Sequence, residues 1–257
     1  MLPPLPFRPP LSSWSGHALV VGAGGIGRAL LQALAERAPG LSLWGASRRG
    51  WPARPGELEL GARALQLDLC DDGSLLAAAA ALQAQAGTLR LVINTAGLLH
   101  DGLSLQPEKR LSQLNRAALE RLFAVNAYGP ILLAQALEPL LPATEPALFA
   151  SLSARVGSIG DNALGGWYGY RSAKAAQNQL LRCLALEWRR RRPLTTVTLL
   201  HPGTTATDLS APFRSGVPPE RLFSPERAAH HLLDVLELQG PEQSGSFLAW
   251  DGSPIPW

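Results

Sequence analysis

Short runs of consecutive apolar residues recur along the chain, and helix-like segments separate most of them. The runs have the length of buried strands, and the segments between them return to an apolar residue every three or four positions. Strands alternating with helices predict an α/β fold: one Rossmann-type domain with a doubly wound, mostly or wholly parallel sheet of about seven strands and helices on both faces. The expected strands are 17–21, 41–46, 64–68, 89–93, 147–152, 194–200 and 246–250.

Helices are expected between these strands. Ser74 is the expected N-cap of the helix 75–86, because a serine oxygen can accept a bond from a first-turn N–H. A long segment containing Asn126 should end near Pro139 and Pro142, and a later helix should end at an arginine cluster. The remaining helices are expected at 28–37 and 225–238, and a loop rich in proline and glycine at 50–57.

The first residues have a different composition. Five prolines before Leu11 predict an extended tail over 1–15, which either docks on the body through residues such as Trp14 or is disordered. No repeat or linker divides the rest of the chain, so 16–257 is expected to be one domain.

Composition excludes several classes of protein. The net charge of +3 comes without a basic stripe and interleaved aromatic residues, so nucleic acid is not an expected partner. Two cysteines, Cys70 and Cys183, indicate a reducing compartment. No apolar run has membrane-spanning length, which predicts a soluble, cytoplasmic protein. His230 and His231 lack partners at metal-ligand spacing, so no metal is expected.

A glycine-rich turn follows the first expected strand directly. It reads Gly22-Ala-Gly24-Gly25-Ile26-Gly27 and opens a helix. Gly22 would permit the tight turn, Gly24 or Gly25 would let the backbone approach a pyrophosphate, and Gly27 would let the helix pack on the strand. The helix N-terminus attracts phosphate charge. The turn therefore predicts a dinucleotide site, and the alternative is a tight turn without a ligand.

The end of the second strand bears on the choice of cofactor. An acidic residue there would bind a ribose diol, but the sequence reads Ser47-Arg48-Arg49. Two cations suit a 2′-phosphate, which predicts NADP(H). The alternative is a solvated basic loop.

Tyr170 and Lys174 are the strongest candidates for chemistry. The chain has 21 arginines but only two lysines, and one lysine follows a tyrosine by four positions. That spacing puts both side chains on one helix face. An adjacent ammonium is expected to lower the tyrosine pKa, which would make the phenol a usable proton donor and acceptor. The alternative is an aromatic residue and a cation at ordinary helical spacing.

The ordered set of motifs resembles the short-chain dehydrogenase/reductase family. Within that family, the sequence is similar to the group that includes C-factor and the sniffer-type carbonyl reductases. The resemblance covers about 16–257, and the order and spacing of its motifs are more specific than any single one. The motifs are the turn 22–27, Asp68, the segment 94–97, Asn126, Ser153, Tyr170-x-x-x-Lys174, and Pro202-Gly203 with Thr205 and Thr207.

The resemblance implies a catalytic set. Tyr170 would act as general acid toward a carbonyl or base toward a secondary alcohol. Lys174 would bind the nicotinamide ribose and lower the Tyr170 pKa. Ser153 would orient the substrate oxygen, and Asn126 would hold a water that links Lys174 to solvent. The implied cofactor contacts are Gly22, Gly24, Gly25, Ile26, Gly27, Ser47, Arg48, Asp68, Leu69, Asn94, Ala96, Gly97, Tyr170, Lys174, Pro202, Gly203, Thr205 and Thr207.

Two departures from the family pattern leave the function open. The glycine turn is one residue shorter than the usual form. Ala154 stands where the family usually has its catalytic serine, and Ser153 comes one position earlier. The sequence therefore predicts an NADPH-dependent oxidoreductase acting on a small carbonyl or alcohol. The alternatives are an NAD(P)-binding signalling or regulatory protein with little turnover, and a structural α/β protein.

Two further expectations come from the resemblance. The variable segment 204–223 should form a substrate lid, and its apolar residues favour an apolar or aromatic wall. The long helices around 115–138 and 167–190 are the candidates for pairing across a two-fold axis in a homodimer or homotetramer.

Overall fold

A computed structural model describes residues 10–51, 61–85 and 87–257. The predicted tail up to residue 9 and most of the loop 50–57 lie outside the described residues. Seven strands form one wholly parallel sheet in the order β3-β2-β1-β4-β5-β6-β9, which confirms the predicted doubly wound fold. The strands are β1 Gly16–Val21, β2 Leu41–Ser47, β3 Arg63–Gln66, β4 Leu89–Asn94, β5 Ala147–Leu152, β6 Thr195–His201 and β9 Ser246–Ala249.

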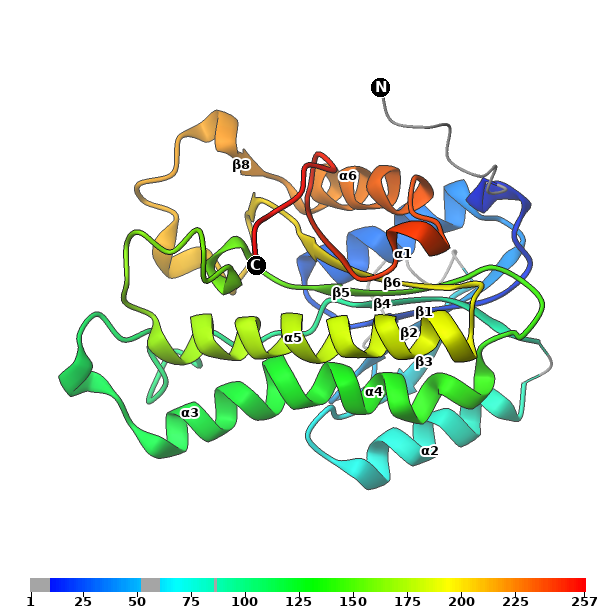
Figure 1. Cartoon of the computed structure of the whole chain (residues 1–257), viewed down its shortest axis with the longest axis horizontal. Coiled ribbons are helices and arrows are strands. Elements are labelled where there is room, and N and C mark those ends of the chain that lie inside the picture. Colours follow the sequence, from blue (N-terminus) through cyan, green and yellow to red (C-terminus); the bar gives the residue numbers. More distant parts are fainter. Residues whose placement is uncertain (1–9, 52–60, 86) are drawn as a thin grey trace.

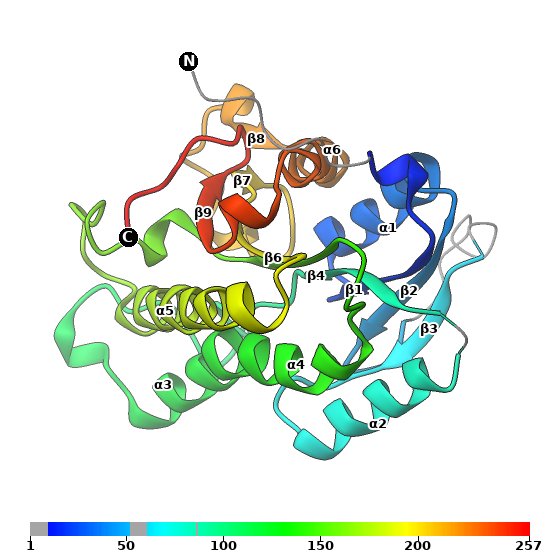
Figure 2. The same ribbon diagram turned by 45° about the vertical axis from the view of Figure 1, so that its right-hand side comes forward.

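Helices cover both faces of the sheet (Figures 1 and 2). Helices α1 and α6 lie on one face, and α2, α3, α4 and α5 lie on the other. A π-helical turn, Ala124–Tyr128, interrupts the long helix expected around Asn126. The helices are α1 Gly25–Arg37, α2 Asp72–Gln83, α3 Arg116–Phe123, α4 Gly129–Leu137, α5 Tyr168–Arg191 and α6 Pro225–Glu237.

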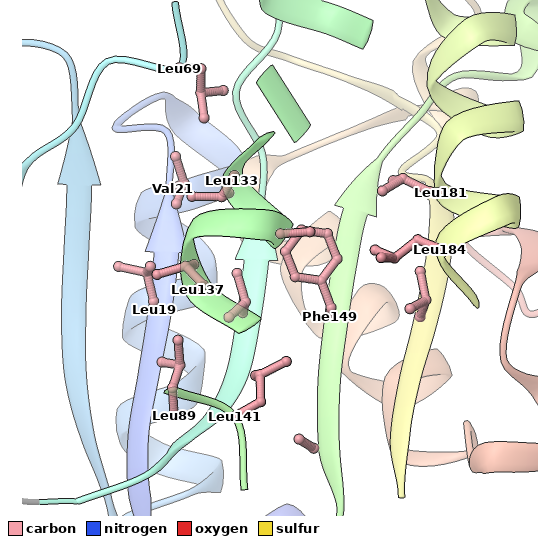
Figure 3. Packing of buried hydrophobic residues seen from close by; sticks show 14 of the residues in the cluster. Leu19, Val21, Leu69, Leu89, Leu133, Leu137, Leu141, Phe149, Leu181 and Leu184 are labelled. Carbon is pink, nitrogen blue, oxygen red and sulfur yellow. The ribbon is translucent and has the colours of Figure 1, made fainter. Parts of the chain in front are cut away.

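The sheet is buried on both faces, which explains why its strands read as continuous apolar runs instead of alternating ones. All six residues of β4 and all six of β5 are buried. Phe149 of β5 packs edge-on against Trp188 of α5, with ring centroids 6.1 Å apart. Figure 3 shows Phe149 among leucines from β1, α4 and α5. This packing fixes α5 against the sheet.

The strand order reverses between β1 and β4, and that reversal positions the site. The chain leaves β1 toward β2 on one side and reaches β4 on the other, so the loops after β1 and β4 separate at the carboxyl edge of the sheet. Ligands of doubly wound folds bind in the crevice at this point.

The glycines of the turn after β1 have separate roles. Gly22 has a φ of 109°, and a Cβ there would lie 2.5 Å from Thr95 Oγ1. A Cβ on Gly27 would lie 1.9 Å from the carbonyl oxygen of Gly22. A Cβ on Gly24 would meet nothing within 4 Å. Gly22 and Gly27 therefore allow the turn to close, whereas Gly24 leaves open space in front of the backbone.

The predicted N-cap of α2 at Ser74 is wrong. The helix begins earlier, because the Asp71 side chain accepts a hydrogen bond from the Gly73 amide at 2.9 Å. Ser74 Oγ instead accepts from the Asp68 amide at 2.9 Å and holds the end of the preceding loop.

The described end of the predicted tail docks on the body. Leu11 and Trp14 are 1% and 2% exposed, and the Arg90 guanidinium lies 4.5 Å from the Trp14 ring centroid.

We expect Gly27→Ala to destabilise the fold by about 1–3 kcal/mol, because the new methyl group forces apart the turn and the helix. Gly24→Ala is the matched control and should cost less than about 1 kcal/mol. Denaturant unfolding of both variants measures the difference, and equal stabilities would contradict the division of roles.

We expect Phe149→Ala to lower the free energy of unfolding by about 3–5 kcal/mol, since it empties a buried position between β5 and α5. Leu164→Ala, at a residue 92% exposed, should change it by less than about 0.5 kcal/mol. Urea unfolding followed by circular dichroism measures both.

Candidate active site

A cavity of about 1000 Å³ opens at the carboxyl ends of the central strands. It contains the glycine turn at one end and Tyr170 with Lys174 at the other. Most of the predicted site residues line it: Gly22, Gly24, Gly25, Ile26, Gly27, Ser47, Arg48, Asp68, Leu69, Ala96, Gly97, Ser153, Tyr170, Lys174, Pro202 and Thr207.

Asn94 lies behind this lining. It is fully buried, its Nδ2 donates to Ser151 Oγ at 3.0 Å, and its Oδ1 accepts from the Ala96 amide at 3.2 Å. It therefore holds the loop after β4 in place. Gly203 and Thr205 also lie outside the lining; Thr205 is 4% exposed and belongs to the turn that carries Thr207.

The side chain of Asn126 likewise forms its hydrogen bonds within the protein. Its Nδ2 donates to the carbonyl oxygens of Leu98 at 2.7 Å and Leu122 at 2.9 Å, and its Oδ1 accepts from the Leu98 amide at 2.9 Å. The side chain ties the loop after β4 to the π-helical turn and makes these bonds instead of bonding Lys174. The water relay through Asn126 stays a prediction.

Tyr170 and Lys174 lie on one face of α5, as their spacing predicts. They are 7% and 2% exposed, and Lys174 Nζ lies 5.8 Å from the Tyr170 ring centroid. The ammonium donates to the Leu152 carbonyl at 2.8 Å and to Gln177 Oε1 at 2.9 Å. The η6 turn, Arg155–Gly157, packs closely on it, since a Cβ on Gly157 would lie 2.8 Å from Lys174 Cβ.

Burial dominates the protonation of both groups. Loss of water lowers the pKa of Lys174 to about 7 and raises the pKa of Tyr170 well above its usual value. The net direction of the Tyr170 pKa is therefore upward, and its lowering by Lys174 stays a prediction. The physical reason is that burial disfavours the charged phenolate of Tyr170, as it disfavours the protonated amine of Lys174.

Ser153 reaches the cavity, but its hydroxyl already has an acceptor. Ser153 Oγ donates to Asn178 Oδ1 at 2.6 Å, and Asn178 lies on α5 two turns after Tyr170. Ser153 therefore faces the cavity with lone pairs, and its hydrogen points to Asn178.

Apolar and aromatic side chains surround Tyr170 on the side of the predicted lid. Trp167 lies 4.9 Å from the ring of Phe213 and 6.4 Å from that of Tyr170. The strands β7, Thr204–Thr205, and β8, Leu222–Phe223, pair and close the two ends of the lid. The side chains packed around Tyr170 are therefore aromatic or apolar, and Leu209 is the apolar side chain of the lid that lines the cavity itself.

Sequence reasoning missed the polar residues at the mouth of the cavity. His100 Nε2 lies 3.2 Å from the Leu209 carbonyl of the lid, and Arg121 pairs with Asp101 at 3.0 Å. His100 and Asp101 lie on a long irregular loop, and Arg121 lies on a surface helix. The periodicity of the sequence around these residues does not indicate that they belong to the site.

The cavity has two features that suit a phosphate-bearing cofactor. Gly24, at the N-terminus of α1, leaves room beside backbone amides, and the exposed side chains of Arg48 and Arg49 supply positive charge at the end of β2. Among the described residues, no group of three or more metal-ligating side chains could hold an ion, and no helix is long and apolar enough to cross a membrane.

The sequence is similar to those of known proteins. A dehydrogenase of Rhodococcus sp. AD45, 1-hydroxy-2-glutathionyl-2-methyl-3-butene dehydrogenase, is 33% identical over 74% of this chain and 78% of its own. C-signal of Myxococcus xanthus is 34% identical over 66% of this chain and 94% of its own.

Solved structures give the same result for the fold. NADPH-bound carbonyl reductase from chicken fatty liver superposes with a TM-score of 0.81 at 25% identity, over 95% of this chain and 99% of that one. Carbonyl reductase Sniffer of Drosophila melanogaster shares the fold with a TM-score of 0.79 at 24% identity, over 95% of this chain and 100% of that one.

The family itself is identified from the sequence. The family model described as short chain dehydrogenase matches residues 16–217. With the parallel sheet, the glycine turn and the Tyr170–Lys174 pair in one cavity, the chain belongs to the short-chain dehydrogenase/reductase family of oxidoreductases.

Proposed function

We propose that the protein is an NADPH-dependent reductase of a carbonyl compound, or in reverse a dehydrogenase of a secondary alcohol, with Tyr170 as the general acid or base. The observation that carries the proposal is the shared cavity: Tyr170 and Lys174 lie in the same hollow as the glycine turn and Arg48. A proton donor and a nucleotide site are therefore within reach of one bound substrate.

The arginines at the end of β2 support the preference for NADPH. Arg48 and Arg49 line the cavity and are exposed, so they can bind a 2′-phosphate. In a relative, the chicken carbonyl reductase, the bound cofactor is NADPH. A short-chain dehydrogenase/reductase from Burkholderia multivorans, also 25% identical, has NADP bound.

Each residue of the site has a defined task. When bound, the nicotinamide supplies the hydride. The Tyr170 hydroxyl donates a proton to the substrate oxygen as negative charge develops there. The buried amine of Lys174 binds the cofactor ribose through an N–H that the protein leaves free. Ser153 accepts from an alcohol hydroxyl as it stands, and donates to a carbonyl only after its hydrogen leaves Asn178.

The apolar wall indicates which substrates fit. Trp167, Phe213 and Leu209 pack beside Tyr170, so the carbonyl should carry an aromatic or aliphatic substituent on that side. Burial of that substituent would contribute about 25 cal/mol per Å² of apolar surface to binding.

A second candidate is a protein that binds NADPH and signals with little turnover. Two observations favour it: the Ser153 hydrogen is already bonded to Asn178, and a relative at 34% identity is named C-signal. Tight NADPH binding, with no oxidation of the cofactor by a broad panel of aldehydes and ketones, would favour this candidate over the reductase.

We expect Tyr170→Phe to lower kcat about 10²–10⁴-fold, because it removes the proton donor. NADPH binding and folding should be retained. Tyr168→Phe, on the same helix and outside the cavity lining, is the matched control and should retain activity. NADPH consumption, followed by its absorbance with a panel of carbonyl compounds, reports the effect; equal activity of Tyr170→Phe and wild type would refute the role.

We expect Arg48→Ala to weaken NADPH binding about 10–100-fold, the loss of one charge-assisted bond to phosphate, and to leave NADH binding unchanged. Arg189→Ala, on the exposed end of α5, should change neither. Titration with NADPH and with NADH, each followed by the shift in melting temperature, gives the two dissociation constants. A larger stabilisation of the wild type by NADH than by NADPH would overturn the cofactor choice.

A further inference from the structure

The surroundings of the Lys174 ammonium include a residue to which the family resemblance assigns no role. Gln177 lies one helical turn after Lys174, is fully buried, and accepts a hydrogen bond from Lys174 Nζ through Oε1 at 2.9 Å. A buried amide is retained only where its polar atoms are satisfied. Here that requirement is met by the buried amine of the site.

The amide of Gln177 is also fixed at its other end. Its Nε2 donates to Ser151 Oγ at 2.8 Å and to the Leu152 carbonyl at 3.2 Å. Flipping the amide would put N–H groups against the ammonium and the amide oxygen against the Leu152 carbonyl, which can only accept. The network therefore sets the orientation of the amide, with Oε1 toward Lys174.

Ser151 is held in turn by the loop that lines the cavity. Asn94 Nδ2 donates to Ser151 Oγ at 3.0 Å, and Asn94 Oδ1 accepts from the Ala96 amide at 3.2 Å. A continuous row of hydrogen bonds thus runs from the loop after β4 through Ser151 and Gln177 to Lys174. The position of the ammonium depends on two strands and one helix.

The hydrogen bonds to the protein use only some of the N–H donors of Lys174. An ammonium has three N–H donors, and the protein accepts two of them through Leu152 and Gln177. Lys174 lines the cavity, and a Cβ on Gly97 would lie 3.9 Å from Nζ, so the third donor has only the cavity to face.

We propose that Gln177 is a positioning residue: its Oε1 fixes the Lys174 amine and stabilises its protonated form, so that one N–H is presented to the cavity. The consequence for catalysis rests on the function proposed above. The effect on Lys174 itself rests on geometry alone and can be measured without cofactor.

The electrostatic surroundings of Lys174 make this effect measurable. The groups that face it in the described part of the chain are the Leu152 carbonyl of β5, the Gly97 loop, Gly157 of η6, and Gln177 and Tyr170 of α5. Of these, Tyr170 alone titrates, and burial raises its pKa. Burial lowers the pKa of Lys174 to about 7, where a titration can follow it, and the groups bonded to its ammonium are the neutral acceptors of Leu152 and Gln177.

The experiment uses the fact that the chain has two lysines, Lys109 and Lys174. Protein labelled with ¹³C-lysine gives two side-chain signals by NMR, and Lys109→Arg assigns them. The Lys174 signal is titrated in the cofactor-free full-length protein for wild type, Gln177→Met and Gln177→Glu. Gln179→Leu is the matched control, because Gln179 is an exposed glutamine of the same helix and bonds Cys183 instead of Lys174.

We expect the two variants to shift the Lys174 titration in opposite directions. Gln177→Met removes an acceptor with little change of volume and should lower the Lys174 pKa by about one to two units, the loss of one bond to a charged group. Gln177→Glu supplies a carboxylate and should raise it by at least about one unit. The control should leave it unchanged.

Equal Lys174 pKa values in wild type and both variants, or shifts in the same direction, would overturn the proposal. A loss of thermal stability without a shift would show a structural role alone and would also overturn it. Should Gln177→Met fail to fold, Gln177→Glu decides: a raised pKa supports the proposal and an unchanged pKa refutes it.

Activity measurements on the same variants distinguish a failure of this inference from a failure of the proposed function. If wild type turns over carbonyl substrates, the alkaline limb of kcat/KM should move to lower pH in Gln177→Met and to higher pH in Gln177→Glu, and unmoved limbs would refute the catalytic consequence. If wild type shows no turnover while the NMR shifts appear, the proposed function fails and the positioning role of Gln177 stands.

Discussion

The arrangement of the site depends on the amine of Lys174, which is buried away from water. A charged group in a protein interior costs several kcal/mol unless well-placed acceptors replace its hydration. For Lys174 these acceptors are the last carbonyl of β5 and an amide of its own helix. Lys174 Nζ reaches the Leu152 carbonyl while Gln177 Nε2 reaches Ser151 Oγ, and these two bonds to β5 fix the position of α5 along the sheet. Gly157 allows the η6 turn to pack against the backbone of α5, since a Cβ there would lie 2.8 Å from Lys174 Cβ and 3.1 Å from its carbonyl carbon.

The sequence predicted the framework well because the framework depends on local patterns. Continuous apolar runs predicted buried parallel strands, and the turn at Gly22 and Gly27 was predicted from residues within one segment. Local signals were less reliable at helix ends, where Asp71 preceded Ser74 as the cap and a π-helical turn interrupted a regular-looking helix.

The hydrogen bonds that hold the site residues in place could not be predicted from local patterns. Ser151 and Gln177 lie on different elements, and no local pattern in the sequence connects one with the other. Their bond joins positions 26 residues apart, so it exists only after β5 and α5 have packed. Asn94 and Asn126 were predicted as site residues, but their side chains bond the protein and shape the loop after β4 instead of lining the cavity.

The ladder between β7 and β8 holds the ends of the segment 206–221 together without involving Tyr170 or Lys174. It pairs Thr205 with Phe223, so the two ends of the segment 206–221 are held together, and Phe223 is anchored against Trp250 at 4.8 Å. Closing a longer loop between fixed ends costs only about 0.6 kcal/mol for each doubling of its length. Insertions and exchanges within the segment can therefore accumulate at little cost in stability. The residues of this segment can therefore change while Tyr170 and Lys174 on α5 stay in place.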